Sequence, residues 1–168
     1  MGCLGVHFAV SAKQLKQLQA AADDDDAVME LIEEIEEEWD EKNLVESDKA
    51  WDAIHRCLTD GTLNDGESHY PLNLVIFGGK QLHQGDDYIV SLITAEQVKE
   101  VATAIQPVTE DWFRSRYFSV LESSDYDSVQ IGEEDFQYTW ENFCDVRALF
   151  LKAAKSKSKS AIIFTASQ

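Results

Sequence analysis

The chain has 168 residues and a mass of 19.0 kDa, a size that suits one domain. Its 32 acidic and 14 basic residues give a formal net charge of −18, which argues against nucleic acid and anionic membrane surfaces as partners. Hydrophobic residues make up 44% of the chain, enough apolar surface for us to expect a folded protein.

Targeting and cysteine patterns predict a cytoplasmic protein with buried thiols. No run approaches the roughly 20 apolar residues that would span a bilayer, and the N-terminus lacks the basic start of a signal peptide. Met1-Gly2-Cys3 looks like an acylation start, but Val6 stands where the motif needs Ser or Thr. The three cysteines are widely separated, which predicts neither a disulfide framework nor a zinc site.

The N-terminal third predicts a strand followed by two helices. Residues 4–10 are a short apolar run with β-branched and aromatic members, as in a largely buried strand. Ser11 and Gln14 form a capping box, which begins a helix over residues 12–22. A second helix follows within residues 23–41.

This second helix is amphipathic and strongly acidic. Twelve acidic residues and no basic ones lie between Asp23 and Glu41, while apolar residues recur at spacings of three and four. One face is therefore expected to pack, and the other to meet water or a basic partner. Four glutamates are the candidate contacts on this acidic face: Glu30, Glu33, Glu34 and Glu37.

The centre of the chain predicts a connection over 43–47, a helix over 48–59 and, after two Asp-Gly turns, a strand over 72–77. The helix carries Trp51 and His55 on one face, so His55 either fills the core or lines a pocket. The strand stops at a Gly-Gly step that lacks the pattern of a phosphate-binding loop.

The C-terminal half predicts a strand, three helices and a final strand. A second capping box, at Thr94 and Gln97, and a polar cap at Thr109 indicate where the first two helices begin. The predicted elements are strand 88–93, a helix that starts at the Thr94 capping box and is ended by Pro107, helix 110–121, loop 123–132, helix 133–155 and strand 161–165. Together these elements predict a single compact α+β domain over residues 1–168. Its small mixed or antiparallel sheet would use strands of about 4–10, 72–77, 88–93 and 161–165, packed with about six helices.

No motif nominates a catalytic, metal or cofactor site. The chain lacks GxSxG and HExxH patterns, and Cys57 diverges by about 200° from His55 on the predicted helix, so the two side chains cannot pair directly. Arg114 and Arg116 are expected to neutralise nearby carboxylates, with an anion contact as the alternative. We therefore predict no catalytic residue, no metal and no cofactor, and we favour a non-enzymatic protein.

Several stretches carry a family resemblance: GVHFAVS at 5–11, SDKAWDAIHRCLTDG at 47–61, PLNLVIFGG at 71–79 and YIVSLITAEQVKEVATAI at 88–105. With them the chain resembles the YfbM-like family of small uncharacterised bacterial proteins, a domain of unknown function. The resemblance implies an α+β single domain of bacterial origin. It implies no accepted reaction and no catalytic residues.

Two functions from different classes follow as hypotheses. The first is a non-enzymatic acidic cytosolic protein that binds another protein, for example by immunity-like neutralisation of a basic partner. The alternative is a small-molecule-binding protein or enzyme with a pocket near five residues: Trp51, His55, Gly78, Gly79 and Tyr88. A structural or regulatory homo-oligomer is a third possibility.

Overall fold

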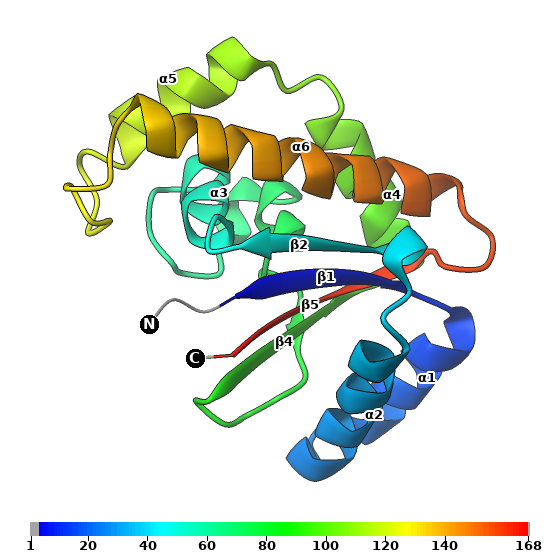
Figure 1. Cartoon of the computed structure of the whole chain (residues 1–168). Coiled ribbons are helices and arrows are strands. Elements are labelled where there is room, and N and C mark those ends of the chain that lie inside the picture. Colours follow the sequence, from blue (N-terminus) through cyan, green and yellow to red (C-terminus); the bar gives the residue numbers. More distant parts are fainter. Residues whose placement is uncertain (1–3, 168) are drawn as a thin grey trace.

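The computed structural model describes residues 4–167, which form one antiparallel sheet with helices on both faces (Figure 1). The strand order is β2-β1-β5-β4-β3. The strands are β1 (Gly5–Val10), β2 (Leu44–Asp48), β3 (Lys80–Gln81), β4 (Tyr88–Ile93) and β5 (Ala161–Ser167). The helices are α1 (Ala12–Ala21), α2 (Asp25–Glu38), α3 (Trp51–Leu58), α4 (Ala95–Ile105), α5 (Glu110–Val120) and α6 (Glu133–Lys155). The predicted α+β class is confirmed.

The two faces of the sheet bury separate apolar clusters. Helices α3, α4 and α6 cover one face, and the α1–α2 pair covers the other (Figure 1). Central strand β5 pairs with β1 from Gly5↔Ala166 to Val10↔Ala161, and six of its seven residues are buried. Such a strand is largely apolar because both of its faces meet helices.

Three helices, α1, α4 and α5, begin where the sequence signals indicated. Both capping boxes form, with Ser11 and Thr94 each accepting a hydrogen bond from the N–H three residues on. Thr109 caps α5 in the same way. These caps are confirmed because a capping hydrogen bond depends only on residues a turn apart.

The predicted strand over 72–77 is wrong. Its first four residues form the 3₁₀-helix η3 (Leu72–Val75), and Ile76 and Phe77 continue in a turn. Leu74, Val75 and Ile76 are nonetheless buried in the cluster under α3 and α4. A short apolar run indicates burial but does not distinguish a strand from a buried turn of helix, and periodicity offered no further signal here.

The predicted connection over 43–47 is also wrong, because Leu44–Asp48 forms the edge strand β2. It pairs with β1 from Val6↔Glu46 to Phe8↔Leu44, with an irregularity near Gly5. This edge strand has two half-buried apolar residues followed by three polar ones, which is a weak apolar pattern, so only its pairing with β1 identifies it. Helix α3 then begins at Trp51, three residues later than predicted.

Three arginines bind carboxylates or backbone carbonyls around the end of α3 and on either side of the predicted 123–132 loop. Arg116 donates to the carbonyls of Cys57 and Thr59 at the end of α3, and Arg114 forms a two-pronged pair with Glu133. Arg56, almost fully buried, bridges Asp52 and Asp125. The prediction that Arg114 neutralises a carboxylate therefore agrees with its contacts, whereas Arg116 satisfies backbone carbonyls.

Candidate functional site

A cavity of about 510 Å³ opens where the start of α3 meets β3 and β4. The cavity lies against the sheet, because its lining residue Ile89 is part of β4. Ile89 pairs with Ala166 on β5, and Ala166 in turn pairs with Gly5 on β1. We call it the Trp51 cavity. Its lining residues are Trp51, Leu63, Asp65, Glu67, Phe77, Gly78, Gly79, Gln81 and Ile89.

Trp51 is fixed against the sheet by the absence of a side chain at Gly5. A Cβ at Gly5 would lie 2.8 Å from both Trp51 Cδ1 and the Phe164 ring. The indole packs on Phe164 at 5.7 Å between ring centroids and meets Phe77 edge to face at 6.0 Å and 81°. Trp51 and Phe77 therefore form a right-angled aromatic corner of the cavity.

The Gly78-Gly79 turn is a tightly packed wall of the cavity. The Gly78 N–H donates to the Asn73 carbonyl at 2.9 Å, and a Cβ at Gly78 would lie 2.3 Å from that same oxygen. The Gln81 side-chain amide donates to the carbonyls of Phe77 and Gly79. Because the Gly78 amide is already used, this turn is built for close packing and is not an open nest for phosphate.

His55 lies behind the cavity wall and does not line it. Its ring stacks on Phe77 at 4.1 Å, and its Nε2 lies 2.6 Å from the Asn64 carbonyl. Because a carbonyl only accepts, Nε2 carries the proton, and the buried Nδ1 has no partner among the described residues. Burial accordingly lowers the pKa of His55, despite the opposing contact with Asn64. His55 is 1% exposed, so it fills the core and connects Phe77 to the loop that carries Leu63 and Asp65.

Tyr88 was predicted in the same pocket, but the structure places it on the opposite face of the sheet. Its ring packs in the cluster under α1 and α2, and its hydroxyl donates to Glu36 at 2.7 Å. Neighbouring Ile89 lines the Trp51 cavity instead. Adjacent strand residues point to opposite faces, and a strand that is apolar on both faces does not show which residue points where.

Sequence reasoning missed Asp65, Glu67 and Leu63 as cavity residues. They lie in the loop after α3, which the sequence identified only as turns. Leu63 is 38% exposed, and neither carboxylate forms an ion pair with any described residue. A leucine inside the polar stretch between two Asp-Gly steps is the sequence signal that could have drawn attention to this loop.

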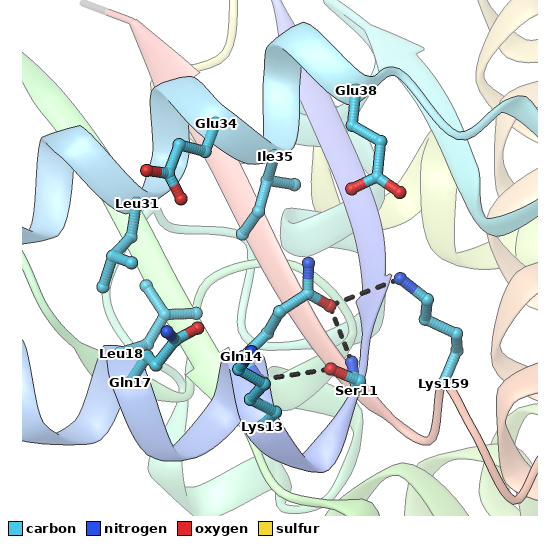
Figure 2. A pocket seen from close by; sticks show the side chains of 10 residues that line it. All are labelled: Ser11, Lys13, Gln14, Gln17, Leu18, Leu31, Glu34, Ile35, Glu38 and Lys159. Atoms are coloured by element: carbon cyan, nitrogen blue, oxygen red, sulfur yellow. Dashed lines mark hydrogen bonds between the residues drawn. The ribbon is translucent and has the colours of Figure 1, made fainter.

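A second cavity, of about 370 Å³, lies between α1 and α2 (Figure 2). Two of its lining residues contact each other, because Lys159 Nζ donates a hydrogen bond to Gln14 Oε1 at 3.3 Å. Glu34 and Glu38 line the cavity from α2. The predicted acidic face borders this cavity, because Glu34 is one of its lining residues. All four predicted residues of that face are exposed: Glu30, Glu33, Glu34 and Glu37. No Lys or Arg within residues 4–167 forms an ion pair with these four glutamates.

The other reactive groups that the structure describes include neither an activated Cys57 thiol nor a metal site. Burial raises the pKa of the Cys57 thiol, which makes it a poor nucleophile at neutral pH. Within residues 4–167, no three His, Cys, Asp or Glu side chains gather where they could hold a metal ion. Over the same range, no helix is long and apolar enough to cross a bilayer. Cys3 lies outside the described residues.

The comparisons with known proteins identify the family. Residues 1–165 match the domain of unknown function DUF1877. The chain belongs to this family. A solved structure of the same fold, YfbM from Escherichia coli, is described as a protein of unknown function. It is similar to this DUF1877 protein with a TM-score of 0.65 and 16% identity, over 98% of this chain and 99% of that one. No curated protein matches the chain. The resemblance to the YfbM-like family is confirmed.

Proposed function

We propose that this DUF1877 protein is a non-enzymatic cytoplasmic protein that binds a basic protein partner through the acidic face of α2, as an immunity protein neutralises a basic toxin. The observation that carries the proposal is the exposed, unpaired row of Glu30, Glu33, Glu34 and Glu37. A chain of net charge −18 also attracts a basic partner over a distance of about a Debye length.

The acidic face carries an internal cost that a basic partner would relieve. Glu30 and Glu34, and Glu33 and Glu37, are like-charged neighbours four residues apart, and each such pair destabilises a helix by about 0.2–0.5 kcal/mol. The last turn of α2 has no basic residue to offset the helix dipole. A cationic surface docked here would replace repulsion with attraction.

Helix α2 is also anchored firmly enough to present a fixed pattern of charge. Asp25 accepts hydrogen bonds from the backbone N–H groups of Gln84 and Gly85, at 2.9 and 3.1 Å. Near the other end, Glu36 accepts from Tyr88, and the buried residues Val28, Ile32 and Ile35 pack on the sheet. A pre-positioned helix loses little conformational entropy on binding.

The test is a pull-down that compares charge-neutral variants. At low salt, the amount of partner retained should fall by about tenfold or more in the variant Glu30→Gln/Glu33→Gln/Glu34→Gln/Glu37→Gln, relative to the natural protein. Its free energy of unfolding should rise by about 0.8–2 kcal/mol, because four repulsive pairs spaced four residues apart are removed: Asp26–Glu30, Glu30–Glu34, Glu33–Glu37 and Glu34–Glu38.

A matched control removes the same charge elsewhere. Glu96, Glu122, Glu134 and Glu141 are exposed, and their replacement by Gln also removes four charges. This control should retain the partner. Equal loss in both variants would show that total charge, and not the α2 face, holds the partner. Failure of the natural protein to retain any basic partner at low salt would contradict the proposal.

The second candidate function is small-molecule binding in the Trp51 cavity. A specific observation favours it: aromatic and aliphatic side chains form a cavity of about 510 Å³ with a few polar groups at its edge, which is typical of ligand sites. Because His55 is sealed behind Phe77, the cavity supports binding and offers no imidazole for acid–base chemistry.

A further inference from the structure

We infer that the Trp51 cavity binds a small organic cation, a primary ammonium group carried on an apolar body. The inference deepens the second proposed function and is independent of the acidic face of α2. It rests on the chemistry of the lining residues: aromatic and aliphatic walls, two carboxylates without cationic partners, and no Lys, Arg or His.

The apolar body of such a ligand has a defined place. Trp51 and Phe77 meet at 81°, and Ile89 and Leu63 add aliphatic surface beside them. A right-angled pair of aromatic rings can surround a compact apolar group and also stabilise a cation near a ring face. Leu63 is 38% exposed, and a ligand in the cavity would remove part of its side chain from water.

The charge of the ligand is selected by Asp65 and Glu67. Both side chains are exposed, and Asp65 uses only one oxygen, in a long 3.4 Å contact with the Glu67 N–H. An ammonium group donates three hydrogen bonds, which these acceptors can receive. An anion would meet two carboxylates and no cation, and the Gly78 amide is already bound to Asn73.

The cavity is held in shape before any ligand arrives. His55 stacks on Phe77 and hydrogen-bonds to the Asn64 carbonyl. The Gln81 side-chain amide donates to the carbonyls of both Phe77 and Gly79. In the loop, Gly66 has a left-handed conformation with φ of 69°. These contacts fix both the aromatic wall and the loop that carries the carboxylates. A preformed site of this kind avoids the entropic cost of ordering its own walls.

The experiment titrates three probes of nearly equal shape into the ¹⁵N-labelled protein: 2-phenylethylammonium, 2-phenylethanol and phenylacetate. The amide signals of Gly78 and Gly79 report on the cavity. We expect the cation to shift these signals at millimolar concentration, the neutral alcohol to bind about tenfold more weakly, and the anion to leave them unchanged.

Two variants with the same change in net charge make the test specific. Asp65→Asn/Glu67→Gln should weaken the ammonium probe about tenfold and leave the alcohol unaffected, whereas Glu96→Gln/Glu122→Gln, at two exposed positions outside both proposed sites, should change neither. Equal binding of alcohol and cation, or equal weakening by both variants, would overturn the cation inference while leaving small-molecule binding in place. No shift at Gly78 or Gly79 with any probe would overturn the inference, and the pull-down result for α2 would stand independently.

Discussion

Gly78→Ala is expected to lower the free energy of unfolding by about 3 kcal/mol, because overpacking against a fixed backbone is costly. The new Cβ would lie 2.3 Å from the Asn73 carbonyl oxygen and 2.7 Å from its carbonyl carbon. Neither atom can withdraw easily, since that oxygen accepts the hydrogen bond from the Gly78 N–H. Urea unfolding followed by circular dichroism measures the effect.

Gly132→Ala is the matched control for this prediction. Nothing lies within 4 Å of a Cβ at Gly132, and its φ of 172° is extended backbone open to any residue. The control should change the free energy of unfolding by no more than about 0.5 kcal/mol. If Gly78→Ala were equally mild, the glycine would not be required for close packing, and its role in shaping the Trp51 cavity would need another explanation.

The natural protein is expected to lose stability on acidification through His7. Burial lowers the pKa of this imidazole to about 3, well below its ordinary value of about 6.5. Between these values the unfolded chain binds a proton that the folded chain does not. Stability therefore falls as pH falls through this window, by about 1.4 kcal/mol per pH unit for one such group. Burial of His55 acts in the same direction.

The environment of His7 explains why the proton is excluded. Its Nε2 lies 3.0 Å from Ser47 Oγ, and the Ser47 hydroxyl is directed to the Gly5 carbonyl, so Nε2 is the donor. The other ring nitrogen, Nδ1, is buried and has no partner among the described residues. A proton there would create a buried charge with nothing to accept its hydrogen bond.

Two variants isolate this contribution. His7→Gln is neutral throughout and should remove about 3 kcal/mol of the stability difference between pH 7 and pH 4. Ser47→Ala keeps the imidazole and removes its partner, so it should lower stability by about 1 kcal/mol at every pH and keep the pH dependence. The measurement is the urea midpoint of unfolding of each variant and of the natural protein at each pH. An unchanged pH dependence in His7→Gln would show that carboxylates, and not His7, cause the loss of stability at low pH.

Several parts of the fold could be predicted because their causes are local. The capping boxes at Ser11 and Thr94 join residues three apart, and the acidic α2 has an apolar stripe that only a packed helix would need. The strands at 5–10 and 88–93 are likewise visible as short apolar runs. The run at 72–77 looks the same in sequence and is a 3₁₀-helix, so burial was predictable there and conformation was not.

The candidate site shows the same division. Composition and helical spacing determined that α2 is acidic, that Trp51 and His55 share one side of a helix, and that no known reactive motif is present. The tertiary structure decided that Trp51, Gly78 and Gly79 surround one cavity, that His55 lies behind it, and that Tyr88 belongs to the opposite face. It also brought Asp65 and Glu67 to the cavity edge. The reason is physical: helix starts and polar faces depend on neighbours within a turn or two, whereas a cavity depends on which distant segments pack together.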